Sequence, residues 1–464
     1  MKEKLSNKLH SIETKDIIIF LIPLIICLIM LIIYYPGIYN FDVFNQLWQI
    51  ENNEFSTGHP FISTFYIMIF HKYIGIHAAL PIFQILWFSL LCSLICKYCR
   101  KDNNKKSNFI FQIIIIIFIS INPLINLSII SNNKDTFFLL TFISICYFLL
   151  KIIVENFANS NKDYILLGMF LVLFGKIRHN GRYTFYIFLI LFFIILLVKL
   201  IKKDKIKLLS FITSIIIFSV ILSIPQKLYN VKMGTNNATG MGTIKALQLD
   251  GYLYRYNILT KDEIQKLSTY VNMQSLYNQS YNTSYLDPLI LVEKTKKYDE
   301  DQKGFINLNK NILFNHLSDS FKFYLASCPI IWRITLPEYI MHSYLWIDID
   351  TPNRSKSINY KMKDTSIFKK TDTTIRKLQD NKIMAAVFYS PATYFYISII
   401  ISIILVIIYR NYSWLLFIFN TINVGILSLS IPVQDTRYLL NTHGLVLILS
   451  IYLINIITKR KAKV

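Results

Sequence analysis

Long apolar segments recur along this chain, and they constrain its fold more than any other feature. An α-helix needs about 20 mostly apolar residues to cross the hydrocarbon core of a bilayer, where lipid offers the backbone no hydrogen-bond partners. Ten such segments lie at residues 17–35, 76–96, 108–128, 136–152, 164–177, 183–199, 208–226, 388–409, 413–431 and 438–458. The sequence therefore predicts an all-α polytopic membrane protein with about 10 transmembrane helices.

The composition supports this class of protein. Of the 464 residues, 54% are apolar and only 16% are charged, whereas soluble proteins are about 25% charged. This balance argues against a soluble enzyme, a disordered tail and a nucleic-acid-binding module. The formal net charge of +22 could suggest a nucleic-acid partner, but in a membrane protein the placement of basic residues matters more than their sum. The expected partner is the lipid bilayer, and no nucleic acid is expected.

The basic residues are distributed unevenly among the segments that join the spans. If the N-terminus lies inside, 21 of the 49 Lys and Arg residues fall in inner loops and termini, and six fall in short outer loops. The others lie in one loop at about 227–387, which is too long to count in the positive-inside rule. The sequence therefore predicts a cell-membrane protein with both termini in the cytoplasm and the long loop outside the cell.

A further apolar stretch at 60–73 needs a different interpretation. If it crossed the membrane, every later segment would be inverted and the charge bias would be lost. We therefore expect it to be an interfacial helix within a first outer loop at 36–75.

Three parts of the chain follow from this topology. They are an N-terminal membrane domain of about seven spans (1–226), an extracytoplasmic, mostly helical domain (227–387) and a C-terminal membrane domain of three spans (388–464). The loop between spans 7 and 8 is long enough to fold as a domain. Within it, Thr260-Lys-Asp-Glu263 is a capping-box pattern that predicts a helix running to about Gln279.

Five groups of polar residues lie at the predicted outer ends of the spans. Ionisable residues beside the hydrocarbon are costly, so each is a candidate for function. The groups are Asp42; His59; Lys134 with Asp135; Arg178 with Asn180 and Arg182; and Asp435 with Arg437. The acids and the histidine played no part in deriving the topology, so their convergence at one side of the membrane is the strongest functional signal in the sequence.

These residue types suit an anionic, phosphorylated ligand held beside a carboxylate. Arginine donates two parallel hydrogen bonds to a phosphate and keeps its charge. A carboxylate in such a site could act as general base toward a hydroxyl acceptor, and the cations could stabilise a departing phosphate as its charge develops.

Each group also has a structural interpretation. Asp42 could only cap a helix at 43–50, and Arg178 and Arg182 could extend toward lipid headgroups. The other interpretations are a turn histidine at His59, a neighbour pair or helix start at Lys134-Asp135, and a mutual loop pair at Asp435 and Arg437.

Several of these motifs together resemble a family of bacterial multi-pass membrane proteins. The motifs are Pro36-Gly-Ile-Tyr-Asn-Phe-Asp42-Val-Phe-Asn-Gln46, His59-Pro60, Lys134-Asp135, Arg178-His-Asn180 and Asp435-Thr-Arg437-Tyr438. That family in turn resembles the GT-C glycosyltransferases, which take sugars from polyprenyl-phosphate carriers at the outer face. The resemblance covers about 300 residues of the membrane portion.

The resemblance implies a GT-C-like helical bundle and a role for each group. The acid at the start of the first outer loop is the expected catalytic base in such enzymes, and Asp42 occupies that place. The residues expected to bind the substrate and the carrier phosphate are His59, Lys134, Asp135, Arg178, Asn180, Arg182, Asp435 and Arg437. The implied reaction is a direct displacement that inverts the anomeric configuration.

One departure from the better-known members concerns metal ions. Many of them have two adjacent acids in the first loop, whereas Asp42 is followed only by Glu51 and Glu54. We therefore expect a metal-independent reaction without a cofactor.

The predicted function is transfer of a sugar from a polyprenyl-phosphate-linked donor to a cell-envelope glycan, teichoic acid or lipid. A flippase or transporter of lipid-linked saccharide is an alternative, but it should carry charged groups along the membrane depth, and the predicted spans are nearly free of charge. A glycan polymerase would share the phosphate-binding arginines and stays open, as does a non-catalytic sensor if Asp42 is only a cap.

Overall fold

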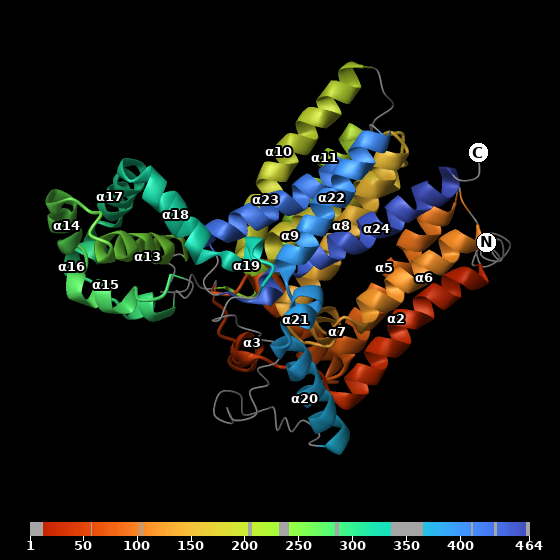
Figure 1. The fold of residues 1–464 in the computed structure, drawn as a ribbon, viewed down its shortest axis with the longest axis horizontal. Helices are drawn as coiled ribbons and strands as arrows, with labels where there is room; N and C mark the ends of the chain where they lie inside the picture. Colours follow the sequence, from red (N-terminus) through yellow and green to blue (C-terminus); the bar gives the residue numbers. More distant parts are fainter. Residues whose placement is uncertain are drawn as a thin grey trace.

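The computed structural model describes residues 13–335 and 365–460, apart from residues 57, 102, 104, 203–206, 232–240, 284–286, 410–411 and 431–433. Within these ranges the regular structure is helical, with isolated bridges such as those between Ile38 and Ser131 and between Val271 and Lys294. The prediction of an all-α protein is therefore confirmed for the described part of the chain (Figure 1).

Seven helical segments are long and apolar enough to cross a membrane. They are α2 (Thr14–Ile33), α5 (Ala79–Arg100), α8 (Lys134–Val154), α10 (His179–Ile201), α11 (Leu208–Ile221) continuing into α12 (Ile224–Leu228), α22 (Pro391–Tyr409), and η4 (Thr436–Leu439) continuing into α24 (Leu440–Arg460). An eighth candidate is the pair α6 (Lys106–Ile121) and α7 (Pro123–Ile129), which is bent by 71°. The protein is thus a multi-pass membrane protein with seven or eight candidate spans among the described residues.

The sequence predicts ten spans, and two of these correspond to shorter helices. Helices α9 (Asn161–Ile177) and α23 (Trp414–Ser430) have 17 residues each, at the lower limit of what can cross a bilayer. The count of ten and the assignment of the cytoplasmic side therefore stay predictions.

The stretch at 60–73 forms α4 (Phe61–Met68) and the π-helix η1 (Ile69–Ile74). Together they are shorter than the candidate spans. Helix α4 packs on α3 (Phe41–Asn52) and against α9, and nearly all its side chains are buried. It therefore belongs to the protein interior at one end of the bundle, while its position relative to an interface stays a prediction.

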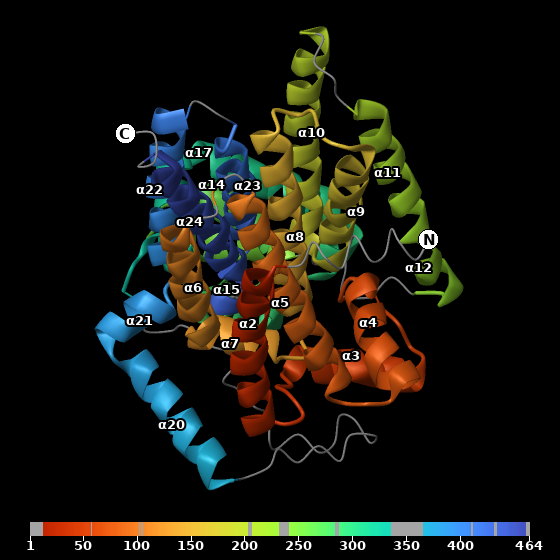
Figure 2. The same cartoon turned by 90° about the vertical axis from the view of Figure 1, so that its right-hand side faces the viewer.

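Helix α8 is the centre of the bundle, because 83% of its apolar window is buried, against 11% for the α11–α12 segment. It packs on α9, α24 and α5 (Figure 2). A helix that is apolar on every side can pack against protein at the centre of a bundle or against lipid at its edge. Helix α8 and the α11–α12 segment can therefore have similar compositions although they differ in burial.

A separate group of helices with its own apolar core lies beside the end of the bundle near α23 (Figure 1). Its elements are α13 (Met241–Arg255), α14 (Lys261–Ser268), α15 (Met273–Gln279), η3 (Asp287–Leu291), α16 (Lys296–Glu300), α17 (Gln302–Asn315) and α18 (Leu317–Ser327). The chain continues through α19 (Pro329–Trp332), and α20 (Ser366–Asp380) and α21 (Lys382–Phe388) precede α22. The predicted domain boundaries at 227–387 are not tested by this arrangement.

The capping box at Thr260 and Glu263 is confirmed, since each residue bonds the backbone nitrogen of the other, at 3.2 and 2.9 Å. The predicted single helix to Gln279 is wrong, because α14 ends at Ser268 and α15 begins at Met273. The side chain of Asn272 accepts hydrogen bonds from two backbone nitrogens at the start of α15, and such a cap favours a new helix over continuation of the old one.

The helical bundle has two ends. The site end is where α2 finishes and α8 and α24 begin, and it also holds α3, α4 and α7. The opposite end is where α2 begins and α24 finishes (Figure 1).

Candidate functional site

Five segments meet at the site end and form what we call the polar cluster. Most of its members lie in the first turn of a helix or directly before one, where the chain enters the bundle. The cluster consists of Asp42 in α3, His59 before α4, Lys134 and Asp135 in the first turn of α8, Arg178 between α9 and α10, Asp435 before η4, and Arg437 in η4.

Asp42 has the most exposed side chain among the charged members of the cluster. Its Oδ2 atom lies 3.2 Å from Nζ of Lys134 and 3.0 Å from Nη1 of Arg437. The Asp42 side chain remains 22% exposed, whereas Lys134 and Arg437 are 11% and 13% exposed. Both ion pairs use the same carboxylate oxygen, so the acid is positioned through Oδ2 and still partly reachable.

The interpretation of Asp42 as a helix cap is wrong. Asn40 is the N-cap of α3, and its side-chain oxygen accepts a hydrogen bond from the backbone nitrogen of Val43 at 3.1 Å. Asp42 lies in the first helical turn, so its carboxylate is available to the cations of α8 and η4.

The electrostatics of the cluster keep Asp42 ionised and His59 neutral. Burial favours a raised pKa for Asp42, but the charges of Lys134 and Arg437 outweigh it and hold the pKa well below its usual range. Burial, together with the charge of Lys134, lowers the pKa of His59 to about 3. Nζ of Lys134 lies 2.8 Å from Nδ1 of His59, so a neutral His59 accepts this hydrogen bond at Nδ1 and carries its proton on Nε2.

A second layer of carboxylates holds the arginines. Nε of Arg437 lies 2.9 Å from Oδ2 of Asp435 and 3.7 Å from Oδ2 of Asp135. The other oxygen of Asp135 lies 2.7 Å from Nη1 of Arg178. The guanidinium of Arg178 lies 4.7 Å from the ring centre of Tyr438. Asp435 and Asp135 are almost fully buried, so these pairs form the floor of the site.

The fixed charges of the polar cluster balance. It contains three cations (Lys134, Arg178, Arg437), three carboxylates (Asp42, Asp135, Asp435) and a neutral histidine. Buried charges are tolerated when they are paired in this way. The cations therefore have partners in the protein itself and do not require a bound anion to offset them.

Two predicted site residues do not join these contacts. The amide nitrogen of Asn180 donates to Oδ1 of Asn423 at 3.1 Å, inside the bundle between α10 and α23. Arg182 is exposed, and among the described residues no carboxylate lies within ion-pair distance of it. The alternative that Arg178 reaches toward lipid headgroups is wrong, since Arg178 is buried; Arg182 keeps that possibility.

Three further residues belong to this region and were not predicted as site residues. Tyr438 stacks on both arginines of the cluster, at 4.7 Å from Arg178 and 5.0 Å from Arg437. Lys176 and His179 flank Arg178 at the junction of α9 and α10. All three lie within two residues of a predicted site residue in the sequence. This closeness is the one feature of the sequence that could have identified them.

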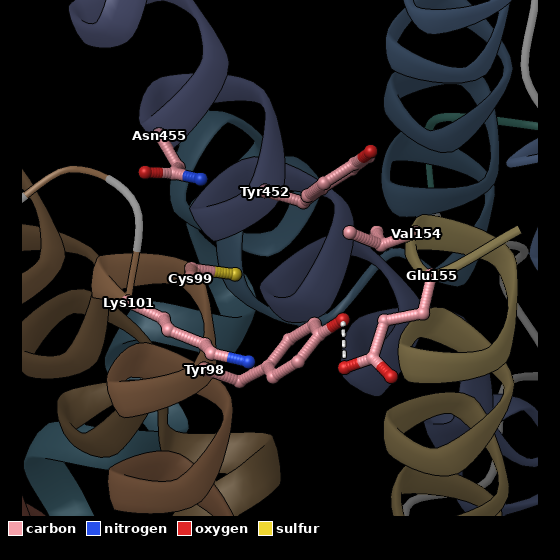
Figure 3. A pocket seen from close by; sticks show the side chains of 7 residues that line it. All are labelled: Tyr98, Cys99, Lys101, Val154, Glu155, Tyr452 and Asn455. Carbon is pink, nitrogen blue, oxygen red and sulfur yellow. Dashed lines mark hydrogen bonds between the residues drawn. The ribbon is translucent and has the colours of Figure 1, made fainter. Parts of the chain in front are cut away.

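A cavity of about 130 Å³ lies elsewhere, at the opposite end of the bundle. Figure 3 shows its lining. It contains no residue of the polar cluster, and its charged members are Lys101 and Glu155. Tyr98 donates a long hydrogen bond of 3.4 Å to Glu155 across it.

Fold and site together define a multi-pass, all-helical membrane protein with a paired charge cluster at one end of its bundle. Comparison of the chain with protein-family models, with curated proteins and with solved structures found no match. Among the described residues, no group of three or more His, Cys, Asp or Glu side chains is arranged to hold a metal ion, and the predicted metal independence stays a prediction.

Proposed function

We propose that this protein is an integral membrane glycosyltransferase that moves a sugar from a polyprenyl-phosphate carrier to a hydroxyl of a cell-envelope glycan, teichoic acid or lipid. The observation that carries the proposal is the state of Asp42, an acid held through one oxygen by Lys134 and Arg437 and still 22% exposed. Such a carboxylate can accept a proton from an incoming hydroxyl.

The proposed reaction is a single displacement at the anomeric carbon of the donor sugar. The acceptor oxygen forms a bond to that carbon while its proton passes to the carboxylate of Asp42. The bond between the carbon and the phosphate oxygen breaks, and polyprenyl phosphate leaves with the electron pair. The anomeric configuration is inverted.

The low pKa of Asp42 fits a late proton transfer. Since Lys134 and Arg437 keep the pKa of Asp42 well below its usual range, the carboxylate is always ionised but is a weak base. Glycosyl transfer passes through a transition state with oxocarbenium character. The acceptor oxygen becomes more acidic as its bond to carbon forms, so a weak base is sufficient at that stage.

The surroundings of the cluster suit a lipid-linked donor. The cluster lies where the helices of the bundle end, so a carrier chain can remain in the membrane while its headgroup reaches Asp42. The side of the membrane follows from the distribution of basic residues in the sequence, with 21 in inner and six in short outer segments, and we therefore propose that transfer occurs at the outer face.

A flippase for lipid-linked saccharides is the second candidate, from a different class. A charged headgroup that crosses the bilayer needs polar groups along its path. The charged residues of the candidate spans lie near the helix ends, for example Lys97 and Arg100 in α5 and Lys199 in α10. This distribution favours chemistry at one surface. A glycan polymerase would use the same cluster with a longer donor.

The test uses the purified full-length protein in lipid, a panel of polyprenyl-phosphate sugars and a crude envelope acceptor. We expect release of polyprenyl phosphate with one donor, and a glycosidic product of inverted configuration by NMR. A retained configuration would contradict direct displacement. No release from any donor, with labelled lipid-linked sugar moving between leaflets of a vesicle, would refute the enzyme and support the flippase. Release only from a carrier bearing a whole repeat unit would instead indicate a polymerase.

A further inference from the structure

The three cations of the polar cluster are already engaged. Lys134 and Arg437 share Asp42, and Arg178 lies 2.7 Å from Asp135. A phosphate that displaced these carboxylates would leave buried acids without partners, which costs several kcal/mol. A phosphate-binding group should therefore be sought among cations that have no carboxylate partner.

Two such cations lie beside the cluster, at the junction of α9 and α10. Lys176 is in the last turn of α9 and is half-buried, and Arg182 is exposed one turn into α10. The two flank the junction of α9 and α10, and no described carboxylate lies within ion-pair distance of either. A pair of like charges without an acid is unfavourable unless an anion joins them.

A surface hollow adjoins Lys176. Its Nζ atom donates to Oγ of Ser223 at 3.1 Å, and Ser223 lines a hollow of about 530 Å³ together with Gln226, Lys227, Asn230 and Val231. Lys227, which is exposed, adds a third cation to this region. The lining of the hollow is thus mostly polar and includes one cation.

The same region is connected to the loop that carries His59. His179, between Lys176 and Arg182 in sequence, lies near the backbone of Gly58. On the other side, the ring of Tyr229 packs on Phe55 and Phe61 at 5.3 and 5.7 Å. An anion bound at Lys176 and Arg182 would therefore lie next to the loop that completes the polar cluster.

The helices below these cations expose apolar side chains. Next to Arg182, α10 presents Tyr183 and Tyr186, which are 60% and 53% exposed, and then Ile190 at 63%. Beside the hollow, Leu228 at the end of α12 is 73% exposed. A basic site above lipid-facing surface fits a phosphate attached to a lipid chain better than a free ion.

We infer that Lys176 and Arg182, with the hollow beside Ser223, bind the phosphate of a lipid, and that the cations of the polar cluster instead position Asp42. If the proposed function holds, this lipid is the polyprenyl phosphate carrier. Lys176 and Arg182 then contact the phosphate, while Lys134 and Arg437 hold the general base.

Binding is measured without turnover, with the full chain in detergent and polyprenyl phosphate as the titrated probe. Each charge-assisted contact to phosphate contributes substantially to affinity, so the double variant Lys176→Gln/Arg182→Gln should raise the Kd by about 10-fold or more. The matched control Lys72→Gln removes an exposed lysine at the same end that bonds Asn53 at 2.9 Å, and its Kd should equal that of the wild type. Arg182→Lys should recover part of the affinity.

Competitors identify the source of the phosphate. Inorganic phosphate at the same concentration should not displace the probe, and equal competition would overturn the assignment to a lipid. Phosphatidylglycerol that competes equally would overturn the assignment to the carrier. A Kd unchanged in the double variant would overturn the inference altogether. Since no sugar is transferred in this assay, a failed transferase assay with the predicted binding pattern would refute the proposed function and leave the inference standing.

Discussion

The two ends of the helical bundle treat buried charge differently. At the opposite end, Asp16 pairs with the buried Arg100, and the side chain of Asp16 is only 6% exposed. Lys151 pairs with Asp163 at the same end. The acids of these pairs are 6% and 11% exposed, and each pair joins two neighbouring helices. At the site end, Asp42 is shared by two cations and remains 22% exposed. Pairing alone is therefore not a sign of function; the informative feature is an acid that is paired and still accessible.

The ion pairs at the two ends also differ in how far apart their partners lie in the sequence. Asp42 and Arg437 are 395 residues apart in the chain, whereas Lys151 and Asp163 are 12 apart. The polar cluster forms only when α3, the start of α8 and η4 come together. This arrangement couples the geometry around Asp42 to the complete fold of the membrane portion.

The largest effect is expected for Arg437→Gln. This guanidinium faces Asp42, Asp435 and Asp135, and removing one partner from a buried ion pair costs about 3–5 kcal/mol. We expect a loss of this order in the free energy of unfolding, measured by thermal unfolding in detergent, together with loss of transfer. An unfolding midpoint equal to that of the wild type would show that the cluster is not a packed unit.

A separation of stability from activity is expected for Arg100→Gln at the opposite end. Arg100 is buried and pairs with Asp16, so we expect a loss of about 3 kcal/mol in the free energy of unfolding. The rate of sugar transfer, measured at a temperature where the variant is folded, should stay within about two-fold of the wild-type rate.

The matched control is Lys97→Gln. It removes a second partner of Asp16, a lysine side chain that is 41% exposed, so it should lower the free energy of unfolding by less than about 1 kcal/mol. A strong loss of transfer in folded Arg100→Gln would break the distinction between the two ends.

The pH dependence of stability should report His59. Its pKa is lowered to about 3, first by burial and then by Lys134, so below about pH 6.5 the unfolded chain binds a proton that the folded chain does not. The associated stability is present above pH 6.5 and is lost as the pH falls toward 3. Between pH 7 and 5 the wild type should lose roughly 1–2 kcal/mol more than His59→Gln. Parallel pH profiles for the two proteins would contradict this account.

The smallest effect is expected at the cavity of the opposite end. The hydrogen bond from Tyr98 to Glu155 is long, at 3.4 Å, so Glu155→Gln should change the free energy of unfolding by less than about 1 kcal/mol. Transfer should be unchanged. A 10-fold loss of transfer in this variant would mean that the opposite end takes part in function.

The class of fold was predictable because it follows from local physics. Apolar runs such as 17–35 must be helical in lipid, and the capping box at Thr260 is a pattern of adjacent residues. The break before α15 was missed because the Asn272 cap becomes decisive only when Val271 bridges Lys294. The predicted ends of the spans lie within about four residues of the helix ends, for the short helices α9 and α23 as well as for the longer α5.

The charged members of the polar cluster were predictable, but of their pairings the sequence suggested only the local one between Asp435 and Arg437. Charged residues at span ends can be recognised from sequence, which is how Asp42 and Arg437 were both identified. The choice of Asn40 as cap, and the pairing of Arg178 with Asp135, depend on which helix starts meet in space. For the same reason, the sequence could not separate Arg182, which has no carboxylate partner among the described residues, from the paired Arg178.

The central claim is that Asp42 acts as the base, and the most direct test compares Asp42→Asn with Glu54→Gln, an exposed acid in the same loop. Release of polyprenyl phosphate from the active donor is measured for both folded variants. The account predicts a fall of about 100-fold or more for Asp42→Asn and a rate within two-fold of the wild type for Glu54→Gln. Equal, undiminished release by Asp42→Asn would contradict it.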